Sequence, residues 1–352
     1  MRVALDATPL ALSTGGLARY TAELAGALAE NYPGDDFALL SDQPFRMPEP
    51  PRRNLWRGSP PQNALERRWW LWGVQRAMAR RHCDLFHGTN FEVPYAPLRP
   101  SVMTVLDLSP WMNPEWHHAA DRVRRRAPLL LGMGIATMVI TPTEAIRAEV
   151  MERFRIAASR AVAVPLGASP VFRPMEVEPA APYFLYVGAL EPRKNLHALM
   201  EAWRTVRRRH SVDLVLAGRR RADFAELEPE PGLRLPGEVS DAELARLYSG
   251  ALSLVYPSHY EGFGLPVLEA MQCGACVFIS RDAALREVAG NAGLSLDGTG
   301  AWVEAMCTAA GNLEWLQARR QASLERARDF SWARTAKLTH DVYQEAARRF
   351  GY

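Results

Sequence analysis

The feature that most constrains the fold of this chain is a regular alternation of short apolar runs with longer amphipathic stretches, which breaks once and then starts again. Before the break, runs typical of buried strands lie at residues 3–6, 37–40, 84–87, 102–106, 138–141 and 162–165. After it, they lie at residues 183–187, 213–217, 233–235, 252–256 and 277–279. Helical patterns separate several of these runs, and such alternation favours parallel sheets covered by helices. The sequence therefore predicts an α/β protein with two doubly wound, Rossmann-like domains.

The break itself is the stretch RPMEVEPAAP after Phe172, whose prolines and glutamates are typical of an extended linker. We expect a first domain over residues 1–172, a linker over 173–182 and a second domain over 183–335. A chain of 352 residues is long enough for two domains of ordinary size. Segment 44–61 contains six prolines and is expected to be a loop rather than a strand.

The charge of the chain argues against bulk binding of nucleic acid. There are 42 basic and 39 acidic side chains, a net charge of +3, which divides into +4 for residues 1–172 and −1 for the remainder. The lysines are Lys194 and Lys337, so arginine supplies the other 40 basic side chains. Four cysteines are too few for a disulfide framework, and the opening MRVALDATPL is typical of a strand rather than a signal peptide. These features predict a reduced, cytoplasmic protein.

The strongest candidate site lies in PSHYEGFGLPVLEAM, residues 257–271, which follows an apolar run and leads into a helical pattern. Gly262 and Gly264 permit a tight loop, and Pro266 suits the first turn of a helix. This arrangement places a helix N-terminus at the carboxyl end of a strand, where open α/β sheets bind phosphate groups. Glu261 lies in the loop and Glu269 lies in the helix, so both carboxylates are expected to face the same ligand.

A second candidate, VGALEPRKNL at residues 187–196, also follows an apolar run and leads into a helical pattern. Arg193 and Lys194 are suited to neutralising a diphosphate. Because the chain otherwise uses arginine almost throughout, a retained lysine suggests a site that requires a compact point charge rather than a guanidinium fork. The alternative is that both residues are solvated charges at the start of a helix.

Together these motifs resemble those of the family-4 retaining glycosyltransferases, which have the GT-B fold. The shared pieces are the two glutamates of EGFGLPVLE, the segment EPRKNL, the segment LPGEVSDAELARLYSGA from Leu235, and STGGLARY at residues 13–20. The resemblance extends to FSWARTA at 330–336 and so covers almost the whole chain. It implies two domains that face each other across a cleft, with a final helix, 336–352, that crosses back to the first domain.

The resemblance also implies roles for the matching residues. Arg193 and Lys194 would stabilise a departing nucleoside diphosphate without a metal ion. Glu261 would contact the transferred sugar near its C3 hydroxyl, and Glu269 would hold the ribose of the nucleotide. The other donor-binding positions, which would approach the phosphates, the sugar or the base largely through the backbone, are Gly15, Gly16, Glu238, Val239, Gly262, Phe263, Gly264 and Leu265.

One departure from the family pattern concerns the first domain. Many relatives carry His-Asp after its fourth strand, whereas this chain reads TVLDLSP, with Leu106 in place of the histidine. Asp107 remains a catalytic and acceptor-side candidate. His87, in DLFHGTN at another strand end, is the second acceptor-side candidate, although a lone histidine at a strand end is more often structural.

These expectations combine into a retaining, metal-independent transfer of a hexose from a nucleotide-diphosphate sugar to a saccharide, lipid-linked or small-molecule acceptor. The EPRKNL and EGFGLP forms are similar to those of bacterial mannosyltransferases of polysaccharide assembly, which favours GDP-mannose over UDP-sugars as the donor. No cofactor is expected besides this nucleotide-sugar co-substrate. The alternative is a noncatalytic nucleotide-sugar sensor, because the departure at Leu106 leaves the acceptor chemistry open.

The segment ERRWWLWGVQRAMARRH, residues 66–82, allows two interpretations. It combines Trp69, Trp70 and Trp72 with five arginines, so it could lie peripherally at the inner face of a membrane and bring the enzyme to a lipid-linked acceptor. Alternatively, the tryptophans pack into the first domain while the arginines are solvated. The second interpretation is favoured.

Overall fold

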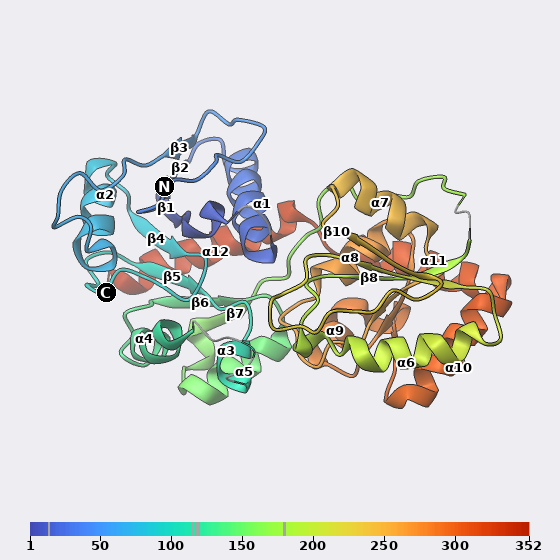
Figure 1. The fold of residues 1–352 in the computed structure, drawn as a ribbon. Helices are drawn as coiled ribbons and strands as arrows, with labels where there is room; N and C mark the ends of the chain where they lie inside the picture. Colours follow the sequence, from blue (N-terminus) through green and yellow to red (C-terminus); the bar gives the residue numbers. More distant parts are fainter. Residues whose placement is uncertain (13–14, 114–115, 117–119, 179–180, 352) are drawn as a thin grey trace. The chain divides into compact units, whose positions relative to one another are not determined.

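The computed structural model describes residues 1–12, 15–113, 116, 120–178 and 181–351, and the chain divides into two compact units (Figure 1). Unit 1 comprises Met1–Gly167 and Ser331–Tyr352, and unit 2 comprises Ala168–Phe330. The first boundary therefore precedes the predicted one at 172. The backbone N–H of Met175 already donates to Ser249 Oγ of unit 2 at 3.2 Å. The predicted linker 173–182, of which 179–180 lie outside the described residues, falls within unit 2.

Unit 1 is built on one sheet of seven parallel strands. The strands are β1 (Arg2–Asp6), β2 (Asp36–Leu40), β3 (Leu55–Arg57), β4 (Leu85–Gly88), β5 (Ser101–Thr104), β6 (Met138–Thr141) and β7 (Ala161–Ala163). Their order is β3-β2-β1-β4-β5-β6-β7, so the direction of winding reverses between β1 and β4. The inner strands are buried almost throughout, as continuous apolar runs in parallel sheets predict.

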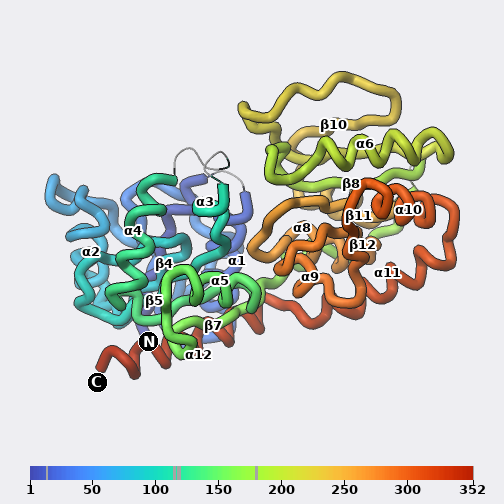
Figure 2. Tube along the Cα trace, turned by 90° about the horizontal axis from the view of Figure 1, so that it is seen from below, coloured from blue at the N-terminus to red at the C-terminus, as the bar shows by residue number. Residues whose placement is uncertain are grey.

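The helices of unit 1 include the last helix of the chain. The α-helices are α1 (Gly16–Asn31), α2 (Val74–Arg80), α3 (Ser109–Met112), α4 (Asp121–Gly132), α5 (Glu144–Phe154) and α12 (Trp332–Phe350), and the short turns are η1 (Thr8–Ala11), the π-helical η2 (Trp69–Gly73) and η4 (Ala158–Arg160). Helix α12 packs beside α1 and contacts β5 and β6 (Figures 1 and 2). Unit 1 thus resumes at Ser331, before the predicted position 336.

The expectation that segment 44–61 has no strand is wrong, because β3 lies within it and pairs in parallel with β2. The strand itself contains no proline, so its N–H groups can join the ladder at the sheet edge. The side-chain amide of Asn54, just before β3, lies 2.9–3.1 Å from the carbonyl oxygens of Ala29, Tyr32 and Asp35. These contacts hold the start of the strand in place against α1 and the turn that follows it.

Unit 2 is built on one sheet of six parallel strands. The strands are β8 (Tyr183–Val187), β9 (Asp213–Ala217), β10 (Leu233–Gly237), β11 (Ser253–Tyr256), β12 (Cys276–Ile279) and β13 (Leu294–Ser295), in the order β10-β9-β8-β11-β12-β13. The helices are α6 (Leu196–Arg207), α7 (Asp241–Gly250), α8 (Leu265–Gln272), α9 (Ala283–Ala289), α10 (Gly298–Gly311) and α11 (Leu313–Ala327), with the 3-10 turns η5 (Pro192–Lys194) and η6 (Gly290–Ala292).

The winding of unit 2 reverses between β8 and β11, which are hydrogen-bonded neighbours. Such a reversal leaves a crevice at the carboxyl ends of the two strands, because their following segments leave toward opposite faces of the sheet. The segment after β8 and the segment after β11 carry the two motifs singled out in the sequence. The topology therefore places both motifs at the ligand-binding position of an open α/β sheet.

Two of the three tryptophans in segment 66–82 pack within unit 1. Trp69 is buried, and the ring of Trp70 meets Phe86 of β4 edge-on, with centroids 6.1 Å apart. Trp72, in contrast, is 45% exposed. The packing interpretation thus describes Trp69 and Trp70 but not Trp72.

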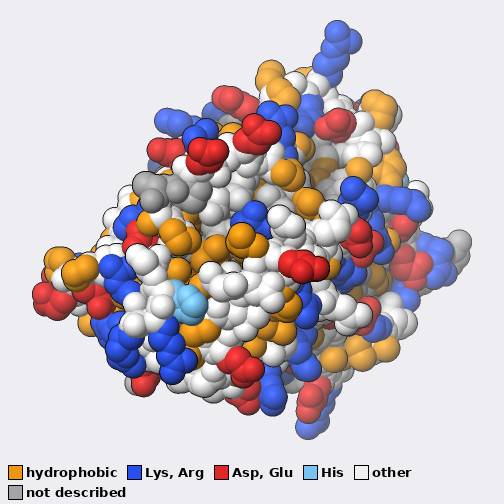
Figure 3. All heavy atoms as spheres, turned by 90° about the vertical axis from the view of Figure 1, so that its right-hand side faces the viewer, with side chains coloured by type: hydrophobic (Ala, Val, Ile, Leu, Met, Phe, Trp, Pro, Cys, Tyr) orange, Lys and Arg blue, Asp and Glu red, His pale blue; other side chains and the backbone are white. Residues whose placement is uncertain are grey.

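Two properties of the molecule bear on its partners. Across the described ranges, no helix combines the length and the apolar character needed to cross a bilayer. On the face drawn in Figure 3, basic and acidic side chains are interspersed, in keeping with the small net charge of the chain.

Candidate functional site

The segment between β8 and α6 presents two adjacent cations. Pro192 starts the 3-10 turn η5, which contains Arg193 and Lys194, and Asn195 ends it with a left-handed backbone (φ 55°). Asparagine is one of the few residues that adopts this conformation readily. The turn buries both cations: the side chains of Arg193 and Lys194 are only 13% and 7% exposed. They are therefore not the solvated charges of the alternative interpretation.

The segment between β11 and α8 runs beside this turn. The backbone N–H of His259 donates to the carbonyl oxygen of Arg193 at 3.0 Å, which ties the two segments together. Gly264 caps α8 with φ 89°, and a Cβ there would lie 2.5 Å from the Leu285 side chain. Only glycine suits both the backbone angle and the space. Pro266 occupies the first turn of α8, as predicted.

The two segments meet in a cluster of charges around Glu261. Lys194 Nζ donates to Glu261 Oε1 and to the hydroxyl of Tyr256, the latter at 3.1 Å. Arg193 lies 3.4 Å from Glu261 Oε2 and donates to the carbonyl of Tyr260 at 2.6 Å. The structure thus brings together three residues that lie in two motifs some 67 positions apart.

The charge state of Glu261 follows from this cluster. Burial alone would raise the pKa of its carboxyl, but the charges of Lys194 and Arg193 outweigh burial and lower that pKa to about 2. The carboxyl is therefore ionised at neutral pH. An ionised carboxylate accepts hydrogen bonds and has no proton to donate, so Glu261 is suited to binding a hydroxyl group rather than to acting as a general acid.

A second carboxylate holds Arg193 from the other side. Glu191, which is 6% exposed, accepts from Arg193 at 2.8 Å and from Arg221 at 2.7 Å. Arg221 belongs to the segment after β9 and was not anticipated from the sequence, where it is one of three consecutive arginines. The ring of Tyr186 stacks on that of Tyr256 with centroids 5.8 Å apart, below Lys194. These contacts fix the positions of both cations in advance of any ligand.

Glu269 has different partners from Glu261. It lies on α8, is 4% exposed, and accepts a hydrogen bond from the hydroxyl of Tyr248 on α7 at 3.0 Å. Burial, followed by the nearby charge of Glu269, raises the pKa of Tyr248 well above its ordinary value, so the phenol remains a donor. The two glutamates therefore provide two distinct hydrogen-bonding points near the start of one helix.

Comparison with known proteins identifies the family of this chain. The family model for glycosyltransferase family 4 matches residues 14–171, and the model for glycosyl transferases group 1 matches residues 172–314. The O-antigen chain mannosyltransferase B of Escherichia coli is 33% identical over 285 residues, which cover 74% of each chain. This chain belongs to the family-4 glycosyltransferases.

Solved structures match the fold of this glycosyltransferase along its whole length. Sucrose-phosphate synthase from Thermosynechococcus elongatus aligns with a TM-score of 0.74 at 20% identity and 98% coverage of each chain. HepE from Anabaena, solved with UDP-glucose, aligns with a TM-score of 0.72 at 17% identity, covering 98% of this chain and 99% of its own. The predicted GT-B architecture, with two Rossmann-like units, is confirmed.

The predicted glycines of unit 1 lie at the start of α1, and their neighbours Ser13 and Thr14 lie outside the described residues. Gly15 is the N-terminal cap of α1 with φ 114°, and Gly16 is its first residue; both are exposed. Apart from the adjoining residues and the backbone of the helix itself, no described atom lies within 4 Å of a Cβ built at either position. Backbone at this helix start is accessible, as an approach to a phosphate requires.

His87 does not line the acceptor side. It is fully buried, and its two ring nitrogens are 2.6 Å from the hydroxyl of Tyr343 and 2.7 Å from Thr104 Oγ1. Tyr343 lies on α12, so the histidine joins the sheet of unit 1 to the last helix. The structural interpretation replaces the acceptor-side one, because both ring nitrogens are used within the core.

Asp107 follows β5, and the two residues expected near the nucleotide base, Glu238 and Val239, follow β10. The carboxylate of Asp107 accepts from the N–H and the hydroxyl of Ser109 at 2.9 and 2.6 Å, and so shapes the turn into α3. Glu238 is exposed and Val239 is half-buried in the turn between β10 and α7. These residues follow the carboxyl ends of β5 and β10, and Asp107 has a local role in the turn as well.

The buried histidine makes the stability of unit 1 depend on pH. Burial lowers the pKa of His87 to about 3 from an ordinary 6.5, so its stabilising effect is complete above 6.5 and is lost as the pH falls toward 3. We expect the difference in free energy of unfolding between the wild type and His87→Gln to shrink by about 2 kcal/mol between roughly pH 7.5 and pH 5. Chemical denaturation at both pH values measures it.

The difference between the two proteins is the quantity to compare, since other groups titrate in the same range. Burial raises the pKa of Asp6, for example, to about 6. The contributions of such groups to the free energy of unfolding are the same in the wild type and the variant, so they cancel in the difference. A difference that stays constant across this pH range would contradict a neutral, buried His87.

Proposed function

We propose that this glycosyltransferase moves a hexose from a nucleotide-diphosphate sugar to a glycan acceptor with retention of configuration and without a metal ion. The observation that carries the proposal is the buried cluster of Arg193, Lys194 and Glu261 at the winding reversal of unit 2. Two fixed cations beside an ionised carboxylate suit a ligand that combines a diphosphate with a hydroxylated sugar.

The chemistry we propose is stabilisation of the leaving group. As the bond between the sugar and the diphosphate breaks, negative charge grows on the diphosphate oxygens, and positive charge grows on the sugar ring. Arg193 and Lys194 are already held in place by Glu191, Glu261 and Tyr256, so they need not reorganise when this charge appears. Cations fixed in this way bind the transition state more tightly than the ground state.

The two glutamates would hold the donor at two points. Glu261, ionised and paired with Lys194, would accept a hydrogen bond from a hydroxyl of the transferred sugar. Glu269, oriented by Tyr248, would accept hydrogen bonds from the ribose hydroxyls of the nucleotide. Oriented carboxylates discriminate strongly in favour of hydroxylated ligands. A ligand without the hydroxyl leaves a buried carboxylate without a hydrogen-bond donor, which costs binding free energy.

The donor we favour is GDP-mannose. The support is the 33% identity to an O-antigen chain mannosyltransferase and the 30% identity over 258 residues to an alpha-(1->4)-mannosyltransferase of Mycolicibacterium hassiacum. The acceptor would then be a growing glycan or its lipid-linked or small-molecule precursor. UDP-sugars are the competing donors, as the UDP-glucose in the HepE structure illustrates for that protein.

The experiment that tests the function is a panel of nucleotide sugars, with binding measured by thermal shift and turnover by release of the nucleoside diphosphate. We expect GDP-mannose to give the largest shift and measurable turnover, and EDTA to leave the rate unchanged because Arg193 and Lys194 supply the positive charge. The anomeric configuration of the product, read by NMR, tests retention. Binding without turnover of any sugar would indicate a sensor, and a strict metal requirement would contradict the mechanism.

We also propose a peripheral membrane contact through segment 66–82. Leu71 and Trp72 are 40% and 45% exposed and lie beside the exposed Arg67 and Arg68, a combination suited to the interface of an anionic bilayer. We expect the protein to float with vesicles that contain phosphatidylglycerol, and Leu71→Ser with Trp72→Ser to reduce the bound fraction severalfold. Equal flotation of the double variant would exclude this contact.

A further inference from the structure

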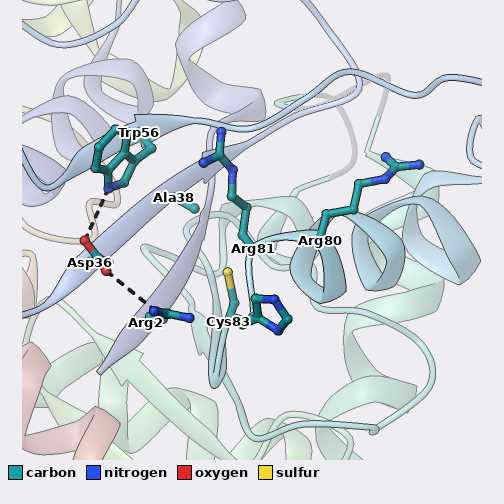
Figure 4. A pocket seen from close by; sticks show the side chains of 8 residues that line it. Arg2, Asp36, Ala38, Trp56, Arg80, Arg81 and Cys83 are labelled. Carbon is teal, nitrogen blue, oxygen red and sulfur yellow. Dashed lines mark hydrogen bonds and ion pairs between the residues drawn. The ribbon is translucent and has the colours of Figure 1, made fainter.

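Unit 1 has a hollow on its sheet, apart from the carboxyl ends where the candidate site residues lie. It encloses about 260 Å³ (Figure 4). Arg2 and Asp36, at the amino-terminal starts of β1 and β2, and Ala38 and Trp56 line one part of it. The register pairs Arg2 with Asp36 and Ala38 with Trp56, so these four side chains share one face of the sheet. The small Ala38 leaves the space that the hollow occupies.

The rest of the lining comes from the end of α2 and the turn after it, Arg80 to Cys83. The side chain of Arg80 is turned away from the other lining residues in Figure 4 because it pairs with the buried Glu66. Arg81 lines the hollow and is exposed, and it forms no ion pair within the described part of the chain. Its guanidinium is therefore available to a ligand.

The charges of the hollow favour an anion. With Arg80 paired to Glu66, the guanidinium groups of Arg2 and Arg81 remain against a single lining carboxylate, Asp36. That carboxylate is already shared between the indole N–H of Trp56, at 3.3 Å, and Arg2, at 3.6 Å. Arg2 is about half exposed in this loose pair, so it can turn toward a second anion at little cost. The exposed ring of Trp56, 45% accessible, adds a flat apolar wall.

We propose that this hollow is a binding site for a phosphate-type anion, held by the guanidinium groups of Arg81 and Arg2 beside the indole of Trp56. Guanidinium groups bind phosphate oxygens through paired, charge-assisted hydrogen bonds, and such bonds are stronger than neutral ones. The indole suits the part of the ligand that follows the phosphate. The same phosphate chemistry is offered by a dissolved phosphate compound and by the headgroup of a phospholipid. The site is independent of the glycosyltransferase reaction, since none of its residues belongs to the cluster of Arg193, Lys194 and Glu261 in unit 2.

Fluorine NMR of protein labelled with 5-fluorotryptophan tests the proposal, with the Trp56 resonance assigned from Trp56→Phe. Inorganic pyrophosphate is titrated at constant ionic strength, with sodium chloride as the reference salt. We expect the Trp56 resonance to move saturably, and Arg81→Ala to weaken binding at this resonance about tenfold or more. Arg46→Ala removes an exposed arginine outside the hollow and is expected to leave the titration unchanged.

Two further arms separate the sources and the sites. Lys194→Ala weakens any pyrophosphate binding in unit 2 and is expected to leave the Trp56 response intact. Flotation is compared between vesicles of phosphatidylcholine with phosphatidylglycerol and vesicles of phosphatidylcholine alone. Flotation that depends on Arg81 indicates that the ligand is a lipid headgroup. A Trp56 resonance that moves with pyrophosphate alone indicates a dissolved anion. A Trp56 resonance that responds to neither probe, or responds equally in Arg81→Ala, overturns the proposal.

Discussion

Replacing Lys194 by alanine is expected to lower the turnover number of sugar transfer by about a hundredfold to a thousandfold, the range found when one preorganised group that stabilises developing negative charge is removed. Lys194 is 5% exposed and contacts Glu261 and Tyr256, so water cannot readily take its place. Because the effect lies in the transition state, the KM for the donor should change much less than the turnover number. Steady-state kinetics over a range of donor concentrations separates the two.

The second lysine of the chain supplies a matched control for this experiment. Lys337 lies exposed on α12 in unit 1, and Lys337→Ala is expected to leave the kinetics unchanged. Loss of Lys194 also leaves the buried Glu261 with one fewer cation, so that Arg193 alone offsets its charge among the described residues, which can destabilise unit 2. Thermal denaturation therefore accompanies the kinetics, and assays are run well below the midpoint of the variant. Unchanged turnover in folded Lys194→Ala would contradict its role at the diphosphate.

Replacing Glu269 by alanine is expected to lower kcat/KM for the nucleotide sugar by about a hundredfold, chiefly by raising KM, since charge-assisted hydrogen bonds are worth roughly 1.5–3 kcal/mol each. The carboxylate is buried on α8 and accepts a hydrogen bond from the hydroxyl of Tyr248, which helps to orient it. Its loss removes binding that the ground state and the transition state share. The measurement is the donor dependence of the initial rate, together with the affinity for the free nucleoside diphosphate.

Tyr248→Phe provides a graded test of the same contact. It keeps the ring, which packs edge-on against Phe172, and removes only the hydroxyl that orients Glu269. We expect KM for the donor to rise about tenfold while the turnover number changes little. If Glu269 binds the ribose, both variants should lose affinity for nucleoside and nucleotide alike. Equal effects on a nucleotide-free sugar phosphate would contradict that assignment.

Much of the fold could be predicted because parallel strands buried on both faces are continuous apolar runs. The boundaries of β6, β8 and β9 agree with those expected from such runs. The short strands β3 and β13 could not be found in this way, because three-residue and two-residue strands at a sheet edge have almost no pattern of their own. Prolines around β3 obscured it further.

The candidate site was partly predictable for a related reason. Strand–loop–helix motifs place Arg193, Lys194 and Glu261 at neighbouring strand ends, and the structure brings them into contact. The partners that orient them, such as Arg221 for Glu191, come from other segments and depend on the sheet order. The burial of His87 could not be predicted for the same reason, since its ring is hydrogen-bonded to Tyr343, which lies 256 residues further along the chain.

The return of the chain to unit 1 has a consequence for how the molecule is made. Unit 2 is one continuous piece, Ala168–Phe330, whereas unit 1 is complete only once Ser331–Tyr352 has been synthesised. During translation the later half can therefore finish folding first, while β4, β5 and β6 wait for their last helix with an apolar surface uncovered. A chain that ends before α12 would keep unit 2 whole but leave unit 1 incomplete, and the incomplete unit would be a substrate for chaperones and proteases.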